Sequence, residues 1–153
     1  IGTVYRYFPD RVAVLQAVAA RNLERVTSAL RTDLEREQPG DVSGALATAL
    51  ETLLHFFREE CGFRSLRVGD VLDIRPSSGG RAGNAEIAGV IKDYLHDAQQ
   101  QRLDSSDRVS IETAVDVMDA LLGRAFMHSD RGESAVIAEA KRVTQCIVND
   151  ATA

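Results

Sequence analysis

The 153-residue sequence contains few residues of the kinds that interrupt helices, form disulfides or bind metals. It has three prolines, two cysteines and three histidines, and no apolar run approaches the roughly 18 residues that a membrane-spanning helix requires. With proline nearly absent from its interior and apolar residues recurring every three or four positions, the chain is predicted to be all-α. Its length and its 44% hydrophobic content are typical of one soluble domain with a real core.

The sequence also lacks the spacings that catalysis and metal binding require. His55, His96 and His128 fall in separate predicted segments, with no His-x-x-x-His or Glu-x-x-His pair. No Gly-x-Ser-x-Gly nucleophile motif is present, and the glycine-rich stretch 75–83 follows no strand and lacks phosphate-loop spacing. We therefore predict a protein that is not an enzyme and has no metal or cofactor. Cys61 and Cys146 are expected to be buried thiols in a reducing cytoplasm, not a disulfide.

The apolar spacing predicts about six helices. Turn signals, capping residues and glycines set their expected bounds. The first runs over residues 10–37 from Asp10, the second from Asp41 or Ser43 to near Cys61 with Gly62 as its C-terminal cap, and the others over 63–74, 84–102 from Asn84, 104–128 and 133–151. Residues 75–83 are expected to form a mobile loop.

Charge is distributed unevenly along the chain. The total is −5, but residues 1–25 carry four arginines against two carboxylates, a net +2, which leaves −7 for residues 26–153. Phosphate repels an acidic surface, so any contact with nucleic acid should be confined to the N-terminal end. The alternative is that this protein never meets nucleic acid.

The first eleven residues contain the most specific motif. The run Gly-Thr-Val-Tyr-Arg-Tyr-Phe-Pro-x-Arg, from Gly2 to Arg11, resembles the end of the recognition helix in bacterial TetR-family repressors. The alternative interpretation is an ordinary aromatic cluster at a chain end. The resemblance implies that Thr3, Tyr5, Tyr7 and Arg11 contact the DNA backbone, and Arg11 keeps the charge of the lysine that is usual at that position.

The same resemblance implies a division of the chain. Residues 1–9 would be the remnant of a helix-turn-helix DNA-binding domain, and residues 10–153 would form a ligand-binding and dimerisation domain. The two preceding helices of such a head do not appear in this sequence. We therefore expect operator DNA to be bound through the complete N-terminal head, and poorly by residues 1–153 alone.

TetR-like proteins dimerise through their last two helices, which form a four-helix bundle with the partner. In this chain both helices carry more apolar surface than one neighbour needs. The alternative is that both apolar faces pack inward on a single chain. The predicted interface residues are Ile111, Met118, Leu121, Leu122, Ala125, Ala140, Val143 and Ile147.

The resemblance further implies a ligand cavity among the middle helices. Such pockets are mostly apolar, with a few orienting polar groups. The candidate lining residues are Tyr94, Phe56, Phe57, Phe63, Leu66, Ile91 and His55, with Arg67 and His96 as further polar groups. Tyr94 combines a ring with a hydroxyl that could orient a ligand, whereas for each apolar residue the alternative is a core role.

The resulting hypothesis is a homodimeric, cytoplasmic transcriptional regulator without a membrane segment. It would be a repressor that a small, mostly apolar effector releases from operator DNA. Two other classes stay open at this point: a helical small-molecule carrier or enzyme, and a helical adaptor without a cavity.

Overall fold

The computed structural model describes residues 11–68 and 79–151, which form six α-helices and no strand. The prediction of an all-α fold is therefore confirmed for this part of the chain. The helices are α2 (Arg11–Glu37), α3 (Val42–Glu59), α4 (Cys61–Val68), α5 (Gly79–Asp97), α6 (Ser105–Ala125) and α7 (Ser134–Ala151). None of them is long and apolar enough to cross a membrane.

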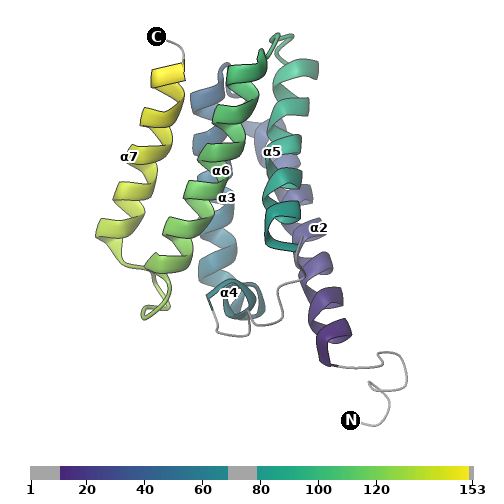
Figure 1. The fold of residues 1–153 in the computed structure, drawn as a ribbon, viewed down its shortest axis with the longest axis vertical. Coiled ribbons are helices and arrows are strands. Elements are labelled where there is room, and N and C mark those ends of the chain that lie inside the picture. The colour runs from purple at the N-terminus through teal and green to yellow at the C-terminus, as the bar shows by residue number, and fades with distance from the viewer. Residues whose placement is uncertain (1–10, 69–78, 152–153) are drawn as a thin grey trace.

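Helix α3 is the centre of the bundle. It contacts each of the five other helices, and nine of its residues, including Leu53 and Phe57, are buried. This burial follows from its sequence, because apolar residues occupy most of its circumference. Helices α6 and α7 pack side by side, joined by a short connection and running in opposite directions (Figure 1). Helices α6 and α7 thus form an antiparallel pair.

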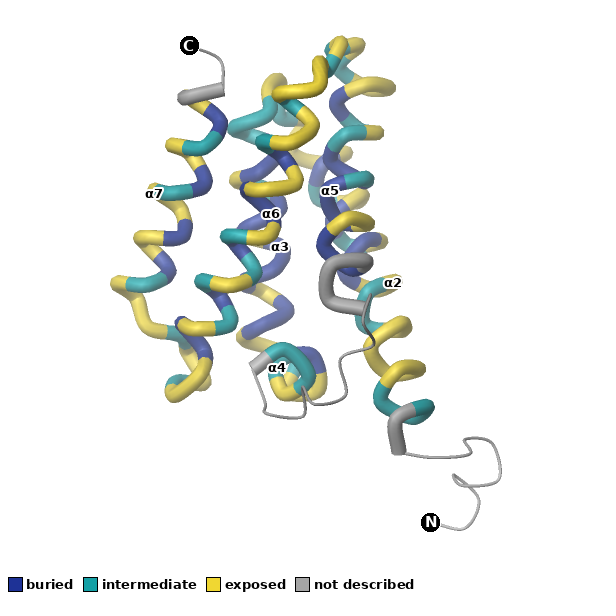
Figure 2. The backbone as a smooth tube through the Cα atoms, viewed as in Figure 1, coloured by how far each residue is buried: buried dark blue, intermediate teal, exposed yellow. Residues whose placement is uncertain are grey.

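The N-terminal part of α2 extends beyond the body of the bundle (Figure 1). Burial along this helix changes accordingly (Figure 2). Residues 16–21 are all exposed, whereas Val26, Leu30 and Leu34 are almost completely buried. The second half of α2 therefore belongs to the core, and the first half is a rod that projects from it.

Polar caps fix the starts of two helices. The Asp41 carboxylate accepts a hydrogen bond from the Gly44 N–H at 2.7 Å and caps α3. Asp104 and Asp107 form a reciprocal capping box at α6, in which each backbone N–H donates to the other side chain, at 3.0 and 2.8 Å. Both caps satisfy N–H groups that have no partner inside the helix. Of the two predicted starts of α3, Asp41 is the correct one.

Several predicted helix boundaries are wrong. Gly62 is not a cap but lies inside α4, because α3 ends at Glu59. The helix predicted to begin at Phe63 begins at Cys61, and its predicted end at Ile74 lies outside the described residues. Helix α5 begins at Gly79, five residues before Asn84, and ends at Asp97 rather than near Arg102. Of the loop predicted over residues 75–83, residues 75–78 are not among the described residues.

The cysteine prediction is also wrong with respect to burial. Cys61 and Cys146 are both free and exposed. Cys61 is the first residue of α4, and Cys146 lies near the end of α7. Other residues fill the apolar positions of both helices. The guanidinium groups of Arg64 and Arg142 lie 3.9 and 3.7 Å from the respective sulfur atoms.

Candidate functional site

The predicted DNA-contact residues precede α2 in the sequence or, in the case of Arg11, begin it. Thr3, Tyr5 and Tyr7 are outside the described residues, and Arg11 is the first residue of α2, with its side chain also outside them. Their contacts with DNA therefore stay a prediction. The first described element after this segment is α2. Residues 16–21 in its first half are all exposed, so the bundle does not pack around them.

Four of the predicted pocket residues belong to the hydrophobic core, and the three phenylalanines among them form an aromatic cluster where α3 meets α4. Phe56, Phe57, Phe63 and Ile91 are all buried. The Phe57 ring lies 5.3 Å from Phe63, edge to face, and 5.1 Å from Phe126, stacked. These distances are those of well-packed aromatic pairs. The cluster therefore contributes to the core, and its role as a pocket wall stays a prediction.

The other three predicted pocket residues lie apart from that cluster or at its edge. Leu66 is half-buried in α4. The Tyr94 hydroxyl donates to the Pro39 carbonyl at 3.2 Å and accepts from the Gln99 amide at 3.0 Å. Tyr94 therefore ties the C-terminal part of α5 to the α2–α3 turn, at the end of the bundle away from α4 (Figure 1). His55 is exposed and meets Phe56 edge to face.

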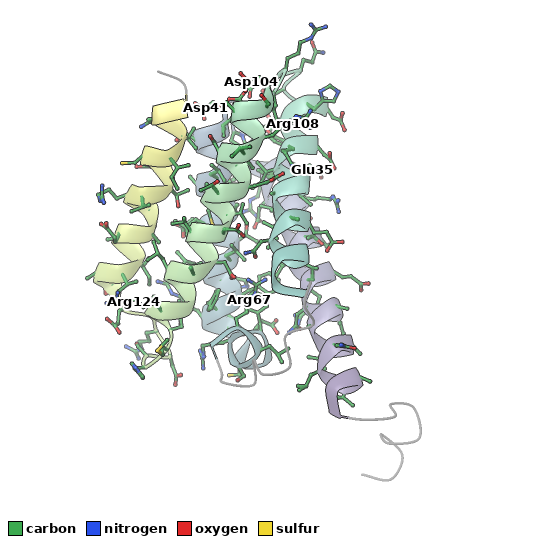
Figure 3. The ribbon with its side chains drawn as sticks, in the orientation of Figure 1. Glu35, Asp41, Arg67, Asp104, Arg108 and Arg124 are labelled. Atoms are coloured by element: carbon green, nitrogen blue, oxygen red, sulfur yellow. The ribbon has the colours of Figure 1, made fainter. Side chains whose placement is uncertain are left out.

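Polar side-chain pairs link α4 and α5 to α6. Arg67 on α4 pairs with Asp119 on α6, and its guanidinium carbon lies 4.8 Å from the centre of the Phe63 ring (Figure 3). On α5, the Asn84 amide donates to Asp116 at 2.9 Å. Three of these four residues were not among the predicted site residues, because their significance depends on contacts between helices.

Two amide atoms near this region are buried without a hydrogen-bond partner. They are Nδ2 of Asn22 on α2 and Oδ1 of Asn84 on α5. The two helices touch at this level, because a Cβ on Gly83 would lie 3.7 Å from the side chain of Leu23. Buried polar atoms nearly always have a partner, so two such atoms on adjacent helices mark a place that a polar ligand group or a water can occupy.

Ion pairs connect α4 to its surroundings. Arg25 on α2 forms a two-pronged pair with Glu60, the residue directly before α4, with one N–O distance of 2.8 Å. The hydrogen bonds from Arg25 lower the pKa of Glu60 below its ordinary value. Arg64 pairs with Asp130 in the α6–α7 connection at 2.9 Å. Ion pairs therefore link α4 and the residue before it to α2, to α6 and to the α6–α7 connection.

The predicted dimer residues divide into two groups. Ile111, Met118, Leu122, Ala125 and Ala140 have no exposed surface in the single chain. They face the core of their own bundle, so their assignment to a surface is corrected. The other three, Leu121, Val143 and Ile147, are half-buried.

The apolar residues that α6 and α7 leave at the surface form what we call the outer α6–α7 face. Val109 is 62% exposed, and the remaining members are half-buried. This face comprises Val109, Val117, Leu121, Val136, Val143 and Ile147. Apolar residues left at the surface of two adjacent helices are typical of an association surface.

Within the described residues, no group of three or more His, Cys, Asp or Glu side chains could hold a metal ion. The three histidines are exposed and lie on α3, on α5 and after α6.

Comparisons with known proteins agree with this architecture. Residues 40–146 match the family described as "Tetracyclin repressor-like, C-terminal domain". The fold is similar to the crystal structure of a TetR-family transcriptional regulator from Streptomyces coelicolor, with a TM-score of 0.75 and 27% sequence identity. That similarity covers 98% of this chain and 79% of the other. No curated protein is significantly similar in sequence.

Proposed function

Because the chain belongs to the tetracyclin repressor-like family through its C-terminal domain, we propose that it is a ligand-responsive, homodimeric transcriptional regulator. The match spans α3, α4, α5, α6 and most of α7. The observation that carries the proposal is the similarity to a transcriptional regulator over almost the whole chain. This similarity favours a regulator over a carrier, an enzyme or an adaptor.

In this proposal residues 1–9 belong to the DNA-binding head, and residues 10–153 form the ligand-binding and dimerisation domain. Thr3, Tyr5, Tyr7 and Arg11 contact phosphates, and α2 is the rod that connects this segment to the body. The net +2 of residues 1–25 against −7 in the remainder supports a contact at this end only.

The outer α6–α7 face pairs with the same face of a second copy. A two-fold dimer then presents two heads to one duplex, and half-sites about 34–36 Å apart or multiples of that suit it. A change in the direction of α2 moves the heads out of this spacing, which lowers affinity for the operator.

The effector binds beside the aromatic cluster, where α2, α4, α5 and α6 meet. Phe63 and Leu66 give apolar contacts, and the unpartnered amide atoms of Asn22 and Asn84 give hydrogen bonds. Because Asn22 belongs to α2, a ligand held by both amides binds one position of that helix better than another. Such a difference in affinity is what shifts a conformational equilibrium.

The proposal is tested by using the protein, as its gene encodes it, to select DNA from a random pool. We expect an enriched inverted repeat, with affinity that falls as salt rises. A thermal-shift screen then identifies effectors, and an effector should weaken binding to the selected DNA. Failure to enrich any sequence, with the protein folded and dimeric, would refute the assignment.

A further inference from the structure

An open groove of about 820 Å³ lies where α2, α3 and α7 meet. Helix α3 lies between the other two (Figure 1) and forms its floor. Asp33, Arg36 and Glu37 line the α2 side, and Lys141 and Thr144 line the α7 side. The groove is separate from the effector region proposed above, because none of Asn22, Phe63, Leu66 and Asn84 lines it.

The floor presents hydroxyl oxygens that can only accept hydrogen bonds. Thr48 donates its single hydroxyl hydrogen to the Gly44 carbonyl at 3.1 Å. Thr52 lies 2.7 Å from Oδ2 of Asp33, and this charge-assisted bond takes its hydrogen. A hydroxyl has one hydrogen and two lone pairs, so the oxygens of Thr48 and Thr52 have acceptor capacity left.

Carboxylates outnumber cations among the lining residues. The carboxylates are Asp33, Glu37 and Glu51, and the cations are Arg36 and Lys141, so the lining has a net charge of −1. Both cations already pair with groove carboxylates: Arg36 with Asp33 at 2.8 Å and with Glu37 at 3.0 Å, and Lys141 with Glu51 across the floor. The side chains of Lys141 and Glu51 are 48% and 59% exposed, and exposed pairs of this kind are weak and readily exchanged.

Thr144 provides an independent indication that the groove is built to hold a ligand. The residue lines the groove but is only 3% exposed, and its Oγ1 has no hydrogen-bond partner. Leaving a buried hydroxyl unpaired is unfavourable. A ligand seated against α7 can supply the missing partner.

We propose that this groove binds a small organic cation with several N–H donors, of the aliphatic diamine class. Its ammonium groups face the carboxylates of Glu37 and Glu51 and the acceptor oxygens of Thr48 and Thr52. The molecule bridges α2 and α7, with α3 beneath it. Occupancy therefore holds the buried half of α2 against the body, at a site distinct from the proposed effector region.

Calorimetric titration of the dimeric protein with 1,4-diaminobutane tests this inference, at an ionic strength of ~0.15 M so that diffuse attraction is screened. We expect saturable binding at one site per chain. The neutral analogue 1,4-butanediol should bind at least about tenfold more weakly, because it keeps the length and loses both charges.

Two groove variants and one matched variant identify the site. Glu51→Gln should weaken diamine binding by roughly threefold to tenfold, since it removes one partly exposed charge and leaves Lys141 unpaired. Thr144→Val should weaken binding while leaving the fold intact, because it removes only the unpartnered hydroxyl. Glu86→Gln, the same charge change at an exposed α5 position outside the groove, should leave binding unchanged.

Absence of saturable binding would overturn the inference. Equal weakening by Glu86→Gln and Glu51→Gln would also overturn it, because the amine would then respond only to net charge. Neither result bears on operator binding, which the selection experiment tests separately.

Discussion

At the scale of single residues, Gly132 is the position where the backbone most strictly limits the side chain. It has φ of +77°, and a Cβ there would lie 2.8 Å from both Ile137 Cδ1 and Phe126 Cζ. Both neighbours belong to the core, so neither can move freely. The α6–α7 connection therefore depends on glycine for conformation and for space.

We predict that Gly132→Ala destabilises the protein by about 2 kcal/mol, combining left-handed backbone strain with the steric conflict. This corresponds to a fall in Tm of about 4–8 °C for a chain of this size. Gly89→Ala is the matched control: it lies inside α5 with no atom within 4 Å of the added Cβ. It should stabilise by about 0.5–1 kcal/mol through helix propensity. Calorimetric melting of both variants checks this, and an unchanged Tm for Gly132→Ala would contradict it.

The Arg25–Glu60 pair should make the attachment of α2 depend on pH. The pKa of Glu60 is lowered by its hydrogen bonds from Arg25. Because its pKa is lowered in the folded protein, the ionised Glu60 carboxylate stabilises the folded arrangement at pH values above 4.5, its ordinary pKa. This stabilisation is lost as the pH falls through the lowered pKa of the folded protein. The protection of α2 amides near Arg25, measured as exchange relative to the intrinsic rate at each pH, should therefore fall below pH 4.5.

Glu60→Gln should remove much of that pH dependence and raise exchange in α2 at neutral pH. Glu139→Gln is the control, because Arg142 lowers the pKa of Glu139 in the same way but the pair lies within α7. If both variants changed α2 exchange alike, the pair with Arg25 would have no specific role.

At the scale of the elements, the start of α6 depends on the Asp104–Asp107 capping box. Asp104→Ala should destabilise the protein by about 1 kcal/mol, because the Asp107 N–H loses its side-chain acceptor. Asp104→Asn keeps the accepting oxygen and should cost much less. Chemical denaturation measures both, and equal losses would show that charge, not capping, is what matters at this position.

Helix bounds were predictable from sequence where local chemistry decides them. Helices α2, α6 and α7 have a clear apolar stripe and polar ends, and their bounds were predicted within a few residues. The start of α5 was not, because Gly79, Gly80 and Gly83 have low helix propensity. Gly83 lies against Leu23, so α2 and α5 approach closely where a small residue is present. Such contacts between helices override local propensity.

The candidate sites were predictable only in part, for the same reason. The buried aromatic residues on α3 and α4 were identified, because apolar density is visible in the sequence. Asn22, Asn84 and Asp116 were not, because their burial and pairing arise between helices. The groove joins residues from Asp33 to Gln145, and His55 is the one predicted pocket residue among those that line it.

At the scale of the whole molecule, the outer α6–α7 face is the surface that we propose for association. Val117 and Val143 are half-buried, yet neither packs against the chain's own hydrophobic core. Apolar side chains placed in this way are unfavourable in a monomer and favourable in a two-fold dimer, where each position occurs twice. The proposed operator geometry requires such a dimer, since one head alone spans one half-site.

We predict that Val143→Glu converts the dimer to a monomer, weakening association by at least about 100-fold, because two unpaired carboxylates would be buried in each dimer. Sedimentation velocity at micromolar concentration measures this, and an unchanged helical circular dichroism signal shows that the bundle stays folded. Ala85→Glu, on the exposed side of α5, introduces the same charge elsewhere and should remain dimeric. If Val143→Glu also remained dimeric, the outer α6–α7 face would not be the interface. The two heads would then be positioned by another surface, and the spacing argued for the operator would no longer follow.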